Sequence, residues 1–288
     1  MTRNFDIHDI SNQISLLEER LAIDEQSLIL WGAEIEFYLR HTSDGEAPNV
    51  DEAERFTLKV QESAGILVEK EKGLGQYELV LPPATSAVVY SEYIARCKML
   101  ACDVAASQGL ITSFAPKPYQ EDHGSGLHIH LNFCDKNDGR NLYSTGQYAE
   151  NRHLMVSIYG ILAKLEAEHD MLISAKDKPR LLATDRESVR NIPAGLCWGG
   201  NNRTTAIRIP DNLPIRRRLE LRVPSADSCP YSVLLFMLDG IDSGLRAEHA
   251  LISHALKYRY PRIYGNAFEQ QYPILRFQQL LEEHGNAA

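Results

Sequence analysis

The side chains best suited to chemistry in this 288-residue chain come in pairs spaced two residues apart. The pairs are Glu34 and Glu36, His128 and His130, and Glu220 and Arg222. Residues two apart on an extended strand point to the same face, and one apolar residue separates each pair: Ile35, Ile129 or Leu221. Three such strands predict a sheet with one core face and one polar face, where carboxylates and an imidazole converge. That combination suits divalent metal ions.

Each pair has a simpler explanation when it is taken alone. A single Glu-x-Glu or His-x-His is most often the solvated face of an edge strand. The segment Gly124-Ser125-Gly126 directly before the histidines favours the metal interpretation, because glycine lets the backbone approach a ligand closely. We therefore base the prediction of a metal site on the set of segments and not on any one of them.

Composition limits the class of protein. A hydrophobic content of 44% and a charged content of 24% are ordinary for a soluble globular enzyme. The net charge is -9 and no basic run alternates with aromatic residues, so we expect no nucleic-acid partner. We find neither a signal peptide nor a membrane span, and the five cysteines show no metal-binding spacing. We expect a cytoplasmic protein with reduced thiols and no membrane partner.

Hydrophobic periodicity predicts helices and strands that mix without a regular βαβ rhythm. Helices are expected over residues 6–22, 51–63, 85–108, 152–169, 231–254 and 273–284. Strands are expected over residues 28–39, 66–69, 110–114, 126–133 and 216–223, and residues 201–210 are expected to enter another. Residues 71–81 are expected to form a glycine-bearing turn that runs into a strand, which Pro82-Pro83 is expected to end. Because no Gly-x-Gly-x-x-Gly or phosphate-loop motif occurs, we predict an α+β fold with an antiparallel sheet.

The motifs, read in order, resemble the catalytic domain of the glutamine synthetase family. The matching segments are Gly32 to Phe37, Glu71 with Gly75 to Glu78, Phe114 to Pro118, Gly124 to His130, Asn202-Arg203 with Arg208 to Pro210, Arg218 to Arg222, Pro230-Tyr231 and Asp239 to Gly244. Each segment is weak evidence alone, but their shared order is specific. The resemblance implies a curved antiparallel sheet packed with helices, and residues 1–288 are expected to form this single domain.

The resemblance also implies two divalent ions per site, Mg²⁺ or Mn²⁺. The expected ligands are Glu36, Glu71 and Glu78 for the first ion, and Glu34, His128 and Glu220 for the second. All six positions carry ligand-type side chains. The set contains five carboxylates and one imidazole. Without a metal the clustered carboxylates would repel one another strongly, which favours a retained metal site.

Arginines supply the remaining implied contacts. The resemblance implies that His130, Arg203, Arg208 and Arg218 bind the ATP phosphates, and that Arg190, Arg222 and Gly124 contact the amino-acid substrate. Arg222 and Arg203 are the implied catalytic residues. A guanidinium binds a planar carboxylate or a phosphate through two parallel contacts, which suits these roles. We expect Arg216 and Arg217 to form ordinary surface ion pairs.

The sequence departs from the family at the ammonia half of the site. Only 33 residues precede Glu34, so we expect the family's small N-terminal domain to be lacking, and a monomer or small homo-oligomer instead of a ring. The family's loop glutamate falls at Leu196, which can neither attract ammonium nor accept its proton. His123 and Cys229 replace two further family residues near the substrate.

These observations predict an ATP-dependent carboxylate–amine ligase that forms a γ-glutamyl-type amide through an acyl phosphate. The acid is expected to be a small glutamate-like amino acid, and the acceptor an amine other than ammonia. Two alternatives stay open: a phosphotransferase that releases a phosphorylated small molecule, and a non-catalytic nucleotide-binding regulator.

Overall fold

The structure is a computed structural model that describes residues 6–185, 187–210, 213–247, 259–270 and 273–283. Its described part is built on one sheet with the strand order β2-β3-β1-β5-β8-β7-β6-β9, and β4 also pairs with β1. The strands are β1 (Ser27–His41), β2 (Leu67–Lys70), β3 (Gln76–Ala84), β4 (Leu110–Ser113), β5 (Leu127–Asp135), β6 (Trp198–Gly199), β7 (Ile207–Arg208), β8 (Leu219–Leu221) and β9 (Arg262–Ile263).

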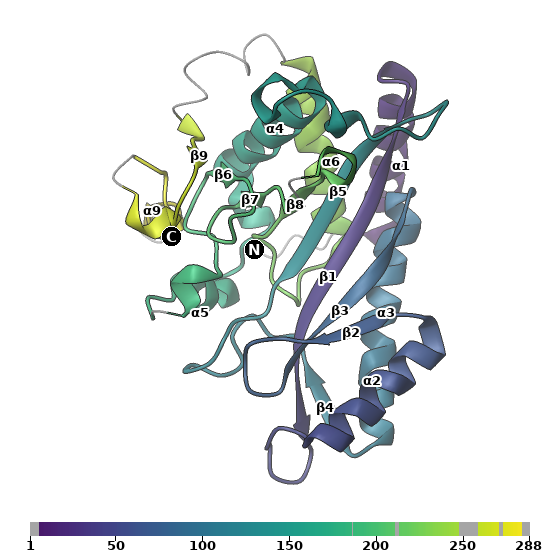
Figure 1. Ribbon diagram of the computed structural model, residues 1–288, viewed down its shortest axis with the longest axis vertical. Coiled ribbons are helices and arrows are strands. Elements are labelled where there is room, and N and C mark those ends of the chain that lie inside the picture. The colour runs from purple at the N-terminus through teal and green to yellow at the C-terminus, as the bar shows by residue number, and fades with distance from the viewer. Residues whose placement is uncertain (1–5, 186, 211–212, 248–258, 271–272, 284–288) are drawn as a thin grey trace.

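The expected α+β class is confirmed, but the sheet is mixed and not purely antiparallel. The long strand β1 forms its axis and pairs antiparallel with β3, β4 and β5 (Figure 1). At the far edge, β6 pairs parallel with both β7 and β9. These edge strands are two residues each, too short for hydrophobic alternation to reveal their direction.

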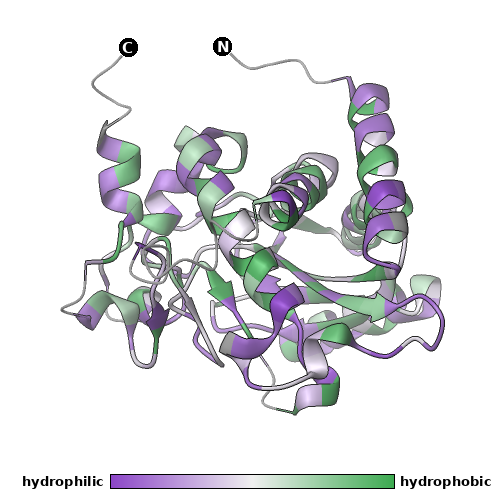
Figure 2. Ribbon diagram, turned by 90° about the horizontal axis from the view of Figure 1, so that it is seen from above, coloured by the Kyte–Doolittle hydropathy of each residue, from purple (hydrophilic) through white to green (hydrophobic). Residues whose placement is uncertain are grey.

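The helices are α1 (Ile7–Asp24), α2 (Val50–Ala64), α3 (Ala87–Ser107), α4 (Arg152–Glu168), α5 (Lys178–Leu181), α6 (Pro230–Arg246) and α9 (Phe277–Glu283). The five longest, α1, α2, α3, α4 and α6, pack on one another at one face of the sheet, whereas α5 and α9 lie apart from them (Figures 1 and 2). Helix α6 packs against α1, α3 and α4, while α1 and α3 also contact β1. The expected helix over 231–254 begins as predicted, and its last seven residues lie outside the described residues.

Local sequence signals explain where the main elements begin and end. Asp6 caps α1 by accepting a hydrogen bond from the backbone N–H of His8. Helix α2 begins with a capping box of Asn49 and Glu52 and ends at Gly65, which adopts the left-handed conformation. The apolar stripe of α1 is buried at Ile10 and Ile14, as its spacing predicts.

Strand β3 does not end at Pro82-Pro83, contrary to expectation. The register with β1 shifts between Trp31 and Ala33, which pair with Ala84 and Leu81 respectively. Two prolines therefore face a single residue of β1, as in a β-bulge, and the missing N–H donors disrupt no regular ladder. The expected strand over 216–223 is also shorter, because Pro214 to Arg216 form a 3₁₀ turn before β8.

Candidate active site

Strand pairing brings the predicted polar residues together on one face of the sheet. In the antiparallel registers, Glu34 lies opposite His128, Glu36 opposite Glu78, and His130 opposite Glu220. The intervening residues Ile35, Ile129 and Leu221 are fully buried in the main hydrophobic core. The predicted alternation of a polar and a core face is thus confirmed on all three strands.

The first cluster joins Glu34, His128 and Glu220, with one ligand-type atom of each within 4.8 Å of the others. The imidazole Nδ1 of His128 lies 3.7 Å from Glu34 Oε2 and 3.8 Å from Glu220 Oε1. This nitrogen is buried and has no hydrogen-bond partner among the described residues. An orphaned imidazole nitrogen between two carboxylates fits a divalent cation with mixed oxygen and nitrogen ligands.

The second cluster shares His128 and adds Glu36 and Glu78. The Nε2 atom of His128 lies 3.9 Å from Glu36 Oε1. Burial and repulsion from the neighbouring carboxylates, first Glu34 and then Glu36, raise the pKa of Glu78 to about 10. A cation beside Glu78 would remove that repulsion, so this residue set also fits a bound metal.

Glu71 belongs to the same region but not to either compact cluster. It lies on the turn between β2 and β3 and lines the hollow beside Glu36. One oxygen of Glu71 accepts a hydrogen bond from the backbone N–H of Lys72 at 3.2 Å. The structure therefore brings five of the six predicted ligands into the two compact clusters and places Glu71 at their rim.

Two arginines hold Glu220 in its ionised form. Arg208 Nη1 donates to Glu220 Oε2 at 2.8 Å, and Arg222 Nη1 donates to Glu220 Oε1. Burial opposes ionisation, but Arg222 and then the two histidines and Arg208 lower the pKa of Glu220 to about 2. Burial also opposes the ionisation of Glu34, but the neighbouring His128 and His130 imidazoles lower the pKa of its carboxyl overall.

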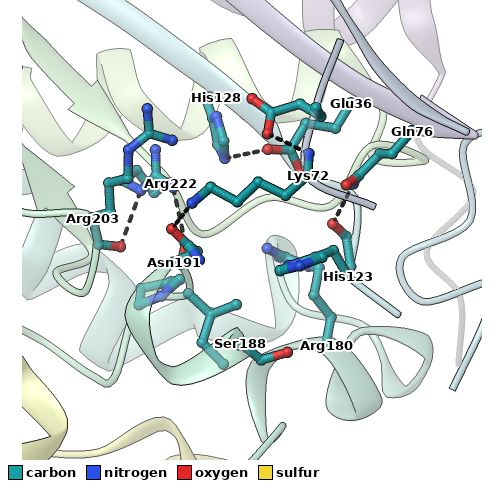
Figure 3. A pocket seen from close by; sticks show the side chains of 14 residues that line it. Glu36, Lys72, Gln76, His123, His128, Arg180, Ser188, Asn191, Arg203 and Arg222 are labelled. Atoms are coloured by element: carbon teal, nitrogen blue, oxygen red, sulfur yellow. Dashed lines mark hydrogen bonds and ion pairs between the residues drawn. The ribbon is translucent and has the colours of Figure 1, made fainter. Parts of the chain in front are cut away.

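A narrow hollow of about 30 Å³ opens beside these carboxylates (Figure 3). Its walls bring together the cations Lys72, Arg180, Arg203 and Arg222. The Nζ atom of Lys72 donates to Asn191 Oδ1 across the hollow, as Figure 3 shows. This free volume is close to that of one water molecule, so the hollow must widen to admit an amino acid.

The structure places some of the residues predicted to contact the substrate at the hollow and leaves Arg190 outside it. Gly124, Arg203 and Arg222 line the hollow, and Arg222 also donates to the backbone oxygens of Asn191 and Arg203. Arg190 is exposed and does not line it. The fully buried Arg180 does line the hollow. Sequence reasoning missed Arg180, as it missed Lys72, whose only signal was its place directly after Glu71.

A second hollow, of about 250 Å³, borders the first cluster at Glu34. It is lined by Glu34, His130 and Arg218, together with Pro83 and neighbouring strand residues. Arg218 Nε donates to His130 Nδ1 at 3.1 Å, and His130 Nε2 lies 3.1 Å from Glu34 Oε1. Two of the four predicted phosphate contacts therefore meet here, next to the carboxylates.

Leu196 is fully buried in the main hydrophobic core and does not line the hollow, and its backbone N–H donates to Leu275 O at 2.8 Å. One expectation about an individual residue is wrong. Arg217 is no surface ion pair: it is buried, donates to the backbone oxygens of Tyr143 and Gly146, and stacks on the Tyr148 ring. Arg216 is exposed, as expected.

The fold is that of a catalytic domain of the glutamine synthetase type. The family described as "Glutamine synthetase, catalytic domain" matches residues 48–260, and the chain belongs to this family. No helix among the described residues is long and apolar enough to cross a membrane.

Similar proteins include several ligases. The chain is 30% identical over 207 residues to γ-glutamylputrescine synthetase of Escherichia coli, covering 70% of this chain and 40% of that protein. It is 32% identical over 185 residues to glutamate–methylamine ligase of Methyloversatilis universalis, covering 60% of this chain and 40% of that protein. A glutamine synthetase of Sulfolobus acidocaldarius is 35% identical over 159 residues, covering 50% of this chain and 32% of that protein.

The alignments span at most about two fifths of the length of these three relatives. Among solved structures, a complex titled "GmaS/ADP complex" superposes with a TM-score of 0.73 at 22% identity, covering 96% of this chain and 68% of that one. A glutamine synthetase of Plasmodium falciparum superposes with a TM-score of 0.68 at 16% identity, covering 83% of this chain and 56% of that one. At these identities the superpositions support the fold alone.

Proposed function

We propose that the chain carries the active site of an ATP-dependent carbon–nitrogen ligase that joins a glutamate-like carboxylate to an amine other than ammonia. The observation that carries the proposal is the cluster of Glu34, His128 and Glu220 beside the half-buried Arg208 and the buried Arg222. Family membership and the ligase names of three relatives support the same reaction class.

Two divalent ions, Mg²⁺ or Mn²⁺, would be held by the two carboxylate clusters, with Glu71 at the rim of the second. The cluster ligands are Glu34, His128 and Glu220 for one ion, and Glu36, Glu78 and His128 or Glu71 for the other. When bound, such ions neutralise the charge that develops on a transferred phosphoryl group. Glu36 is fixed for this task, because its Oε2 accepts a hydrogen bond from the backbone N–H of Gly126 at 2.7 Å.

We assign one substrate to each of the two hollows beside the carboxylates. ATP would bind at the larger one, where His130 and Arg218 would contact its phosphates. The acid would bind at the narrower one once it widens, where Arg203 and Arg222 would orient its carboxylate and stabilise negative charge on the phosphoryl group. The carboxylate oxygen then attacks the terminal phosphorus, ADP leaves, and an acyl phosphate forms.

In the second half of the reaction the amine must be neutral when it attacks. The loop over residues 191–193 offers no base to remove a proton from it. The amine nitrogen attacks the acyl carbon, phosphate leaves, and the nitrogen loses a proton. The loop residues that line the hollow are Asn191, Ile192 and Pro193, and none of these carries a carboxylate. The names of two relatives, a putrescine and a methylamine ligase, support an alkylamine as the acceptor.

The test is a matrix of acids and amines assayed for ADP release with Mg²⁺. The proposal expects ADP release that requires both an acid and an amine, and equimolar formation of amide. Glu220→Ala serves as the inactive control. Release of a stable phosphorylated product without amide would establish the phosphotransferase alternative, and ATP binding without any turnover would establish the regulator.

A further inference from the structure

Arg180 is a buried cation on the wall of the narrow hollow. It lies on the short helix α5, which follows a capping box formed by Ser174 and Asp177. Its exposed fraction is only 3%, yet its side chain lines the hollow together with His123 and Gly124. The fold thus orders this guanidinium before any ligand binds.

The contacts of Arg180 leave part of its hydrogen-bonding capacity unused. One terminal nitrogen donates to Val223 O and lies 3.7 Å from Asp177 Oδ1, too far for a hydrogen bond. Its Nε is buried and has no hydrogen-bond partner among the described residues. A buried guanidinium is costly unless its N–H groups are paired, so this arrangement favours an anionic ligand.

Gly124 permits Arg180 to reach the hollow. A Cβ atom at position 124 would collide with Cγ of Arg180, so a side chain there would displace the arginine. This is a close approach that only glycine allows. The glycine predicted to contact substrate therefore acts by making room for the guanidinium.

Two other cations of the hollow already have partners, and the third, Arg203, is exposed. Arg222 is bonded to Glu220 and to two backbone oxygens, and Lys72 is bonded to Asn191. Arg190, the arginine that sequence reasoning chose for this role, is exposed and outside the hollow. Arg180 is therefore the best-placed buried group for a second negative charge on the acid.

We propose that Arg180, and not Arg190, binds the carboxylate of the acid substrate that does not react. This assignment rests on the proposed function, because it takes the narrow hollow as the acid site. It also explains the position of Arg180 at the wall formed by His123 and Gly124, while the reacting carboxylate would lie toward Arg203 and Arg222.

The experiment measures binding by calorimetry in the presence of ADP and Mn²⁺, so that it needs no turnover. The probes are L-glutamate and 4-aminobutyrate, which lacks only the α-carboxylate. The variants are Arg180→Met, Arg180→Lys, Gly124→Ala and Arg190→Met. Arg217→Met is the matched control, because Arg217 is also a buried arginine bonded to backbone oxygens but lies outside the hollow.

We expect the wild type to bind glutamate more tightly than 4-aminobutyrate. Arg180→Met should weaken glutamate binding about 10- to 150-fold, the range for a hydrogen bond to a charged group, and leave 4-aminobutyrate binding within about twofold. Gly124→Ala should reproduce the loss without removing the charge. Arg180→Lys should recover part of the affinity, and Arg190→Met and Arg217→Met should bind glutamate as the wild type does.

Equal binding of the two probes by the wild type, unchanged glutamate affinity in a folded Arg180→Met protein, or loss of affinity in Arg190→Met would each overturn the assignment. If Arg180→Met does not fold, Gly124→Ala decides the matter. A chain that binds glutamate through Arg180 but forms no acyl phosphate would refute the proposed ligase and leave the role of Arg180 intact.

Discussion

Replacing Glu220 by alanine should remove both a metal ligand and the partner of the buried Arg222 and the half-buried Arg208. The Glu220 side chain is fully buried, and its two oxygens receive Arg208 and Arg222. Removing one member of a buried ion pair costs about 3–5 kcal/mol, because the remaining charge stays buried without compensation. With a urea dependence of about 3 kcal/mol per molar, the unfolding midpoint should fall by about 1–1.7 M.

Glu34→Ala provides the matched comparison, because Glu34 belongs to the same cluster but its ion pairs are with histidines, and its side chain is 24% exposed. Both variants should weaken Mn²⁺ binding by more than about 100-fold, since loss of a direct ligand exceeds the usual effect of an outer contact. Only Glu220→Ala should also lose several kcal/mol of stability in EDTA. Urea unfolding and Mn²⁺ titration measure the two effects separately. Wild-type Mn²⁺ affinity in Glu220→Ala, or equal stability of the two variants in EDTA, would refute the reasoning.

Three further predictions concern the carboxylates, the loop and the lysine. In the folded metal-free protein, the raised pKa of about 10 keeps a proton on Glu78, whereas the unfolded chain loses that proton above about pH 5. The free energy of unfolding should therefore fall as pH rises above about 5, by up to ~1.4 kcal/mol per pH unit. Urea midpoints between pH 6 and 9 should show this slope in EDTA, and Mg²⁺ or Glu78→Gln should flatten it; a flat profile in EDTA would contradict it. Leu196→Glu should lower the free energy of unfolding by several kcal/mol and give no ammonia-dependent ADP release, because the Leu196 side chain is fully buried in the core. A stable variant that uses ammonia would contradict this prediction. Lys72→Ala should tighten Mn²⁺ binding about two- to fivefold by calorimetry, since it removes a positive charge beside Glu71; weaker binding would argue against this.

The sheet and its polar face could be predicted because both depend on local alternation. Glu34 with Glu36 and His128 with His130 show the two-residue period of a strand, and each pair encloses a residue that the structure buries. Strand pairing then places the pairs opposite one another, which local pattern alone does not determine. The bulge at Pro82-Pro83 and the parallel edge at β6 depend on such pairing, and the sequence did not reveal them.

The substrate side was harder to predict because it is built from loops. The family's loop glutamate falls at Leu196, six residues after Arg190. Spacing along a loop does not give the direction of a side chain, however, and Leu196 is buried in the core. Arg180 showed no signal, since its importance arises from contact with Gly124, which is distant in sequence. The residues that define specificity here are thus visible only in the folded chain.

The central claim is the formation of an acyl phosphate that is captured by an amine other than ammonia, and hydroxylamine tests it most directly. Hydroxylamine is largely neutral at pH 7, whereas ammonia is mostly protonated and depends on a base worth roughly 10²–10⁴-fold in rate. With ATP, Mg²⁺ and a dicarboxylic amino acid, the wild-type chain should form the hydroxamate, while ammonium should give little amide. Glu220→Ala should form neither product. Efficient amide formation from ammonium by the wild type, or no hydroxamate with any acid that the chain binds, would contradict the account.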